Sequence, residues 1–84
     1  MNHEQHKAKI RWRCRRGMLE LDLILGRFLE THLDSMTSQQ LEQFEAFLMS
    51  TDPDLYAWCM GYESPINKEF FNVVRLIRSV SSPE

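Results

Sequence analysis

The sequence predicts an all-α protein, a compact five-helix bundle folded as a single domain, and three observations favour this class. Three glycines and three prolines among 84 residues are too few for the turns of a small β-sandwich or barrel. No long run of Val, Ile and Thr suggests a strand. Hydrophobic residues form 43% of the chain and charged residues 26%, as in globular proteins. A chain this short holds one core, so we expect one helical domain over residues 1–84, ordered from about 8 to 78.

Two helices are expected in the first part of the chain. The first runs from about Glu4 to Cys14, where Ile10 and Cys14 form the only inward pair and Trp12 falls on another side. Its expected surface residues are Lys7, Lys9, Arg11, Arg13 and Arg15. Gly17 then gives the backbone freedom to turn. After it, apolar residues recur at three- and four-residue spacing and predict a long second helix, with its inner face formed by Met18, Leu21, Ile24, Leu25, Phe28, Leu29 and His32 or Leu33.

Capping signals place three further helices. Thr37 and Gln40 form a capping box, in which each side chain accepts from the other residue's backbone N–H, and this box opens the third helix. Asp52 is the expected cap of the fourth helix, with Pro53 as its first helical residue and Gly61 available to end it. A fifth helix is expected to start near residue 67. The expected inner residues of these helices are Leu41, Phe44, Phe47, Leu48, Leu55, Trp58, Cys59, Tyr62, Phe70, Val73 or Val74, and Ile77.

No set of side chains in the sequence predicts an active site or a metal site, so we expect no enzyme. His3 and His6 share one helical side but lack a third ligand nearby. Cys14 and Cys59 each stand alone and are expected to be packing thiols. No apolar stretch approaches the roughly 20 residues of a membrane span, and no apolar signal core follows the basic N-terminus. We therefore expect a cytoplasmic protein and not a membrane protein.

Charge is distributed unevenly along the chain, although the net charge is only −2. Residues 1–16 carry +5, residues 17–56 carry −7, and residues 57–84 balance at zero. A basic leading segment on an acidic body can meet an acidic protein, a phosphate-bearing ligand or nucleic acid. Charge alone does not choose among these partners.

Opposite charges crowd the predicted turn between the first two helices, at Arg15, Arg16, Gly17, Glu20 and Asp22. One interpretation is an intramolecular clasp in which Arg16 and Glu20 pair across the turn, worth at most about 1 kcal/mol if exposed. The other is a rigid docking surface, because a clasp of that strength is little reason to concentrate so much charge beside a glycine.

Two sequence blocks carry a resemblance to a known family. Arg16-Gly17-Met18-Leu19-Glu20 is an RGxxE motif within a longer W-x-C-R-R-G-M-x-E-L-D stretch, and a second block, D-P-D-L-Y-A-W, runs from Asp52 to Trp58. With both blocks in this order, the chain from Ala8 to about Arg78 resembles the succinate dehydrogenase assembly factor family. The resemblance implies a five-helix all-α fold.

The resemblance also implies a chaperone-like assembly factor that is not itself an enzyme. Such a factor binds the flavoprotein subunit of succinate dehydrogenase and promotes its covalent flavinylation with FAD. The fumarate reductase flavoprotein is a further candidate client. No cofactor of its own is expected, because FAD is attached to the client, and no FAD-binding residue is identified. The implied partner-binding surface consists of Arg16, Gly17 and Glu20, flanked by Arg15 and Asp22.

Two other functions stay open. Some members of the family have been described as antitoxins paired with a membrane-associated toxin, so an antitoxin-like regulatory module is an alternative. A weaker alternative is a nucleic-acid-binding helical domain, in which Trp12 stacks on a base among Lys7, Lys9, Arg11 and Arg13. The pI of about 5.9 lies far below the basic range typical of such domains, so no nucleic acid is expected as a partner.

Overall fold

The computed structural model describes residues 3–81, which form five α-helices and one short 3-10 helix. The elements are α1 (His3–Arg13), α2 (Leu19–His32), η1 (Leu33–Ser35), α3 (Ser38–Leu48), α4 (Asp52–Met60) and α5 (Lys68–Ser81). No strand occurs within this range, so the predicted all-α five-helix fold is confirmed. No helix among these residues combines the length and apolar character needed to cross a membrane.

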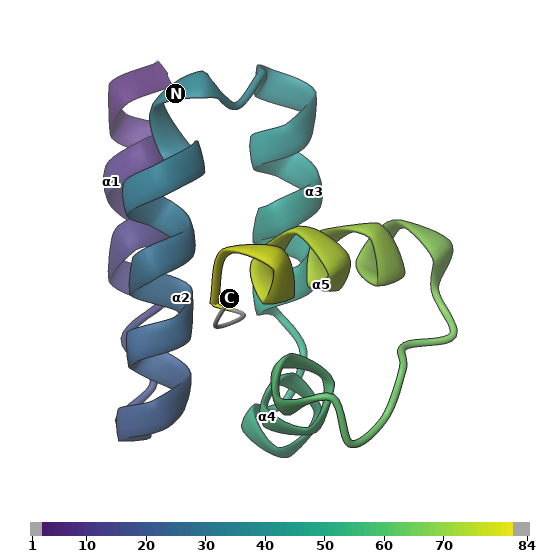
Figure 1. Ribbon diagram of the computed structural model, residues 1–84. Coiled ribbons are helices and arrows are strands. Elements are labelled where there is room, and N and C mark those ends of the chain that lie inside the picture. Colours follow the sequence, from purple (N-terminus) through teal and green to yellow (C-terminus); the bar gives the residue numbers. More distant parts are fainter. Residues whose placement is uncertain (1–2, 82–84) are drawn as a thin grey trace.

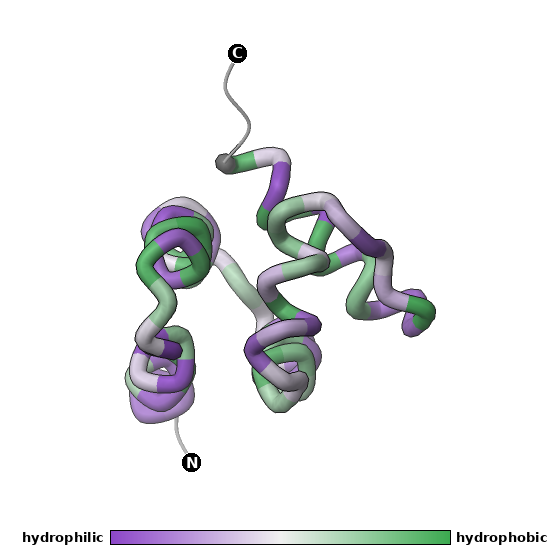
Figure 2. Tube along the Cα trace, turned by 90° about the horizontal axis from the view of Figure 1, so that it is seen from below, coloured by the Kyte–Doolittle hydropathy of each residue, from purple (hydrophilic) through white to green (hydrophobic). Residues whose placement is uncertain are grey.

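Helices α1, α2 and α3 stand side by side, while α5 runs across α3 toward α2 and α4 lies near one end (Figure 1). Seen along their axes, α1 and α2 are neighbouring columns joined by a short turn (Figure 2). The two columns have different main partners, because α1 packs chiefly against α3 and α2 packs chiefly against α5. The seam between α1 and α2 is therefore not a closely packed helix pair.

One apolar cluster fills the interior of the described chain. Aromatic rings run through its centre: the ring centroids of Phe28 and Phe44 lie 5.2 Å apart, and those of Phe47 and Phe70 meet edge to face at 5.6 Å. Rings of this size dominate the apolar area that a small core buries. The buried members of the cluster are Ile10, Cys14, Leu21, Leu25, Phe28, Leu33, Leu41, Phe44, Phe47, Leu48, Leu55, Cys59, Val73, Val74 and Ile77.

The helix ends follow local chemistry closely. The capping box is confirmed, because the Gln40 N–H donates to Thr37 Oγ1 at 3.1 Å and the Thr37 N–H donates to Gln40 Oε1 at 2.9 Å. Gly61 ends α4 in the left-handed conformation, with φ of 84°. The expected cap of α4 is wrong: Thr51 is the N-cap and accepts from the Asp54 N–H at 3.4 Å, so that Asp52 is already helical.

Two expected side-chain positions are also wrong. Lys7 was expected on the surface of the first helix but is only 6% exposed, and its ammonium group lies 3.4 Å from Asp34 and 3.7 Å from Glu4. Tyr62 was expected to face inward but is 72% exposed. The left-handed turn at Gly61 ends α4 at Met60, before Tyr62 is reached, and directs Tyr62 away from the inner face of this helix.

Candidate functional site

Gly17 forms the turn between α1 and α2, and its backbone conformation requires glycine. Its φ is +86°, a left-handed value that other residues rarely adopt. The residue is exposed, and a Cβ atom added there would meet nothing within 4 Å. The main chain at Gly17 is therefore strained for any side chain yet open to close approach from outside.

Arg16 ties the turn to the junction between α3 and α4. Its Nε donates to Asp52 Oδ1 at 2.7 Å and its Nη1 donates to the Leu48 carbonyl at 3.0 Å. The same guanidinium also donates to the carbonyl oxygens of Arg13 and Ser50, at 3.0 and 3.2 Å. The expected pairing of Arg16 with Glu20 is therefore wrong, because these internal acceptors occupy the guanidinium.

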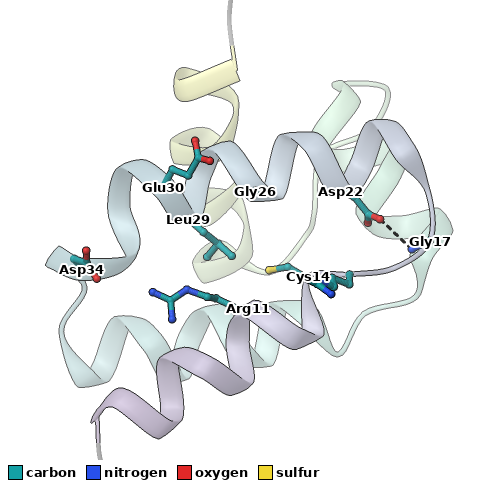
Figure 3. Close-up of a pocket in the computed structure, with 9 residues that line it drawn as sticks. Arg11, Cys14, Gly17, Asp22, Gly26, Leu29, Glu30 and Asp34 are labelled. Carbon is teal, nitrogen blue, oxygen red and sulfur yellow. Dashed lines mark hydrogen bonds between the residues drawn. The ribbon is translucent and has the colours of Figure 1, made fainter.

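Asp22 closes the turn from the side of α2. One carboxylate oxygen accepts from the Arg16 backbone N–H at 2.9 Å, and the other accepts from the Gly17 N–H at 3.2 Å (Figure 3). A half-buried carboxylate that satisfies two successive main-chain donors fixes the turn's conformation. Asp22 thus acts on the backbone of the RGxxE motif and holds it in place.

Glu20 and Arg15 face solvent at the same corner. Glu20 is exposed and its Oε1 accepts from the Tyr56 hydroxyl at 2.8 Å, a hydrogen bond that raises the pKa of Tyr56. Arg15 is exposed, and within residues 3–81 its side chain has no hydrogen bond or ion pair. We call the solvent-facing set of Arg15, Gly17 and Glu20 the docking corner. The structure brings all five predicted site residues together but divides them between this corner and the two internal ties, Arg16 and Asp22.

The two sequence blocks contact each other directly. Arg16 of the first block pairs with Asp52 of the second, and Glu20 of the first accepts from Tyr56 of the second. Both contacts span 36 positions in the sequence. The second block is visible in the sequence, but the contacts of Asp52 and Tyr56 with the first block are not. The presence of both blocks in one chain was the feature of the sequence that could have indicated a contact between them.

An open groove extends from the corner along the seam between α1 and α2, with a volume of about 880 Å³ (Figure 3). One wall carries Arg11 of α1 and Arg15 of the turn that follows it, and Gly26 and Glu30 of α2 lie on the other. The seam is open beside Gly26, since a Cβ atom added to it would also meet nothing within 4 Å. Gly17 and Asp22 lie at one end of the groove and Asp34 lies at the other.

The groove and core contain thiols that are poorly suited to chemistry. Burial raises the pKa of Cys14, on the groove, to about 12 and that of Cys59 to about 11. Both are free thiols and stay protonated at neutral pH, as packing residues do. His6, one of the two histidines considered as metal ligands, lies 2.7 Å from Glu45 Oε1. Within residues 3–81 no group of three or more His, Cys, Asp or Glu side chains is placed to hold a metal ion.

Acidic side chains of the same chain neutralise most cations of the basic leading segment. Glu45 on α3 lies 2.9 Å from Lys9 Nζ and 3.8 Å from Arg13 Nε, and the hydrogen bond from Lys9 lowers the pKa of Glu45. Lys7 and Arg16 are also in ion pairs. Among the described cations that precede Gly17, those without an ion pair are Arg11 and Arg15, and both lie on the groove.

Residues 8–81 match the family model described as flavinator of succinate dehydrogenase. FAD assembly factor SdhE of Legionella pneumophila (strain Lens) is 47% identical over 75 residues, which cover 89% of this chain and 94% of that protein. The protein of the same name from Coxiella burnetii is 45% identical over 82 residues, covering 98% and 100%. That of Vibrio cholerae is 52% identical over 58 residues, covering 69% and 67%. The family match spans both sequence blocks.

Proposed function

The chain belongs to the family of flavinators of succinate dehydrogenase, and from this membership we propose that it is an assembly factor for covalent flavinylation of that enzyme's flavoprotein subunit. The docking corner formed by Arg15, Gly17 and Glu20 is the surface that we assign to the client. Arg16 and Asp22 support this surface from inside. The assignment rests on the contact between the two sequence blocks. The internal hydrogen bonds of this contact and of Asp22 hold the turn in one conformation, while Arg15, Gly17 and Glu20 stay exposed to a partner.

The proposed action is positioning, with no bond made by side chains of this chain. FAD becomes attached to the client, whose own residues and cofactor supply the chemistry. A rigid partner can raise the population of a reactive client arrangement by binding it better than the unreactive one. The high pKa of Cys14 and Cys59 supports this assignment, because neither thiol is a ready nucleophile at neutral pH.

The client range and compartment are part of the same proposal. We include the fumarate reductase flavoprotein as a second client, to be tested beside the first. We place the protein in the cytoplasm, which suits two free buried thiols. Nucleic acid is a poor partner for this surface. Of the four cations considered for it, Lys7, Lys9 and Arg13 are held by acids of the same chain, and Arg11 alone has no ion pair among the residues that the structure describes.

The test measures covalent flavin in the client flavoprotein as in-gel fluorescence after denaturation. The lanes contain no assembly factor, the wild type, Glu20→Gln or Tyr56→Phe. Glu20→Gln removes the charge, whereas Tyr56→Phe removes the internal hydrogen bond and keeps the charge of the Glu20 carboxylate. We expect strong signal with the wild type and Tyr56→Phe, and weak signal with Glu20→Gln.

Other outcomes separate the alternatives. Equal loss in Glu20→Gln and Tyr56→Phe would mean that Glu20 acts only by holding α4. Equal signal in every lane, including the lane without assembly factor, would remove the flavinylation role and favour an antitoxin-like module.

A further inference from the structure

The groove between α1 and α2 has unpaired charges on both walls. Arg11 and Arg15 lie on one wall, and Glu30 on the other has no ion pair within residues 3–81. Asp34 continues the acidic wall and is largely exposed, with Lys7 at 3.4 Å. Arg11 and Arg15 on one wall and Glu30 on the other therefore carry opposite charges that no ion pair within residues 3–81 neutralises.

We infer that this groove binds a segment of the client flavoprotein, with acidic side chains directed at Arg11 and Arg15. The inference rests on the proposed function and extends its surface, because the groove is continuous with the docking corner at Gly17 and Asp22. Its occupant is a polypeptide of the client, since the corner is already assigned to that protein.

The two arginines lie on either side of the end of α1. Arg11 is in its last turn, and Arg15 lies two positions beyond Arg13, where the helix ends, so it reaches the groove from the turn that leads to Gly17. Neither has an ion pair within residues 3–81, and two such cations on one wall suit acidic side chains of an occupant. Glu30 lies on the opposite wall, where basic or polar groups of the occupant suit the charge.

Gly26 keeps the groove wide enough for such a segment. It lies within α2, where glycine costs about 1 kcal/mol relative to alanine and where its backbone needs no special conformation. A Cβ atom at this position would meet nothing, so packing inside the chain does not require glycine either. Space for another molecule's chain explains the residue better than any contact within the fold.

The test compares client affinity among three variants and the wild type. Gly26→Trp fills the groove, and Arg27→Trp is the matched control on the exposed neighbouring position of α2. The double variant Arg11→Glu with Glu30→Arg exchanges the charges of the two walls and keeps the net charge. Affinity for the purified flavoprotein subunit of succinate dehydrogenase is measured by calorimetry, and circular dichroism confirms folding of each variant.

We expect Gly26→Trp and the charge-exchange variant to weaken client binding by roughly ten-fold or more, and Arg27→Trp to stay within about two-fold of the wild type. Wild-type affinity in both Gly26→Trp and the exchange variant would overturn the groove assignment and leave the docking corner untouched. If Gly26→Trp fails to fold, the affinity of the charge-exchange variant alone tests the groove assignment. A wild type that neither binds the client nor promotes flavinylation would remove the proposed function and this inference together.

Discussion

Replacing Arg16 by lysine is expected to destabilise the fold strongly, although it preserves the charge of the RGxxE motif. The guanidinium donates to the carbonyl oxygens of Arg13, Leu48 and Ser50 and to the carboxylate of Asp52. A lysine ammonium is a single compact donor group on a flexible side chain. It cannot donate at the same time to all the acceptors that surround the planar guanidinium of Arg16. The junction of α1, α3 and α4 therefore loses most of its polar ties.

The magnitude follows from the exposure of the partners. The Arg16 side chain is 19% exposed and that of Asp52 is 39% exposed, so their ion pair is screened by solvent and contributes about 0.2–1 kcal/mol. Hydrogen bonds from a charged donor contribute about 1.5–3 kcal/mol each when buried, and less here because water can reach the released carbonyls. Losing two of the three carbonyl bonds gives about 2–3 kcal/mol, or roughly 10–20 °C in Tm for a domain of this size.

The assay is urea unfolding followed by far-ultraviolet circular dichroism, with Arg15→Lys as the control. Arg15 directly precedes Arg16 in the sequence, but its side chain has no partner in the described chain. Its replacement should therefore change the free energy of unfolding by no more than about 0.5 kcal/mol. A double-mutant cycle with Asp52→Asn measures the coupling between Arg16 and Asp52. Equal unfolding midpoints for Arg16→Lys and Arg15→Lys would refute the view that Arg16 is an internal tie.

Three further predictions concern stability. Gly17→Ala should lower the free energy of unfolding by about 1–2 kcal/mol because of its positive φ and not because of a clash, and an unchanged urea midpoint would contradict that geometry. Burial raises the pKa of Cys14 and Cys59 above 9.0, so the folded state retains protons that the unfolded state loses. Stability should therefore fall as pH rises from about 9 toward 11 and 12, and Cys14→Ala with Cys59→Ala should flatten this slope. The hydrogen bond from Lys9 lowers the pKa of Glu45, so its stabilisation is present above pH 4.5 and is lost as pH falls below that value. Glu45→Gln should remove that acid dependence in pH-resolved urea titrations.

The sequence predicted a helix end correctly where the residues that form the cap are close together in the chain. The capping box of Thr37 and Gln40 and the left-handed Gly61 needed only a few adjacent residues. The cap of α4 was misplaced because Thr51 and Asp52 are both good capping residues. The Asp52 carboxylate accepts from Arg16, 36 positions away, and Thr51 caps the helix. That choice depends on a distant guanidinium, which a local pattern does not contain.

The sequence indicated where the candidate site lies, but not which of its residues face solvent and which form internal hydrogen bonds. The density of charge around Gly17 indicated the corner, and the structure gathers all five predicted residues there. Which arginine faces solvent depends on where the carbonyl oxygens at the end of α3 lie, and Arg15 and Arg16 are indistinguishable by composition. The ion pair of Lys7 has the same origin, because its partner Asp34 belongs to η1, a short 3-10 helix that the periodicity of the second helix does not reveal.

The internal ties also bear on how tightly the exposed groups can bind. A flexible charged corner would lose side-chain and backbone freedom on association, and ordering each mobile side chain costs about 0.5–1.5 kcal/mol. At Gly17 the backbone is already fixed by Asp22, and the Glu20 carboxylate is already oriented by Tyr56. Binding therefore orders little at the corner itself. The groove cations without an ion pair in residues 3–81 are Arg11 and Arg15, and in the proposed complex new ion pairs to acidic side chains of the client would offset the cost of ordering them. This arrangement explains why a chain of net charge −2 can offer a locally cationic surface while acids of its own neutralise the rest of α1.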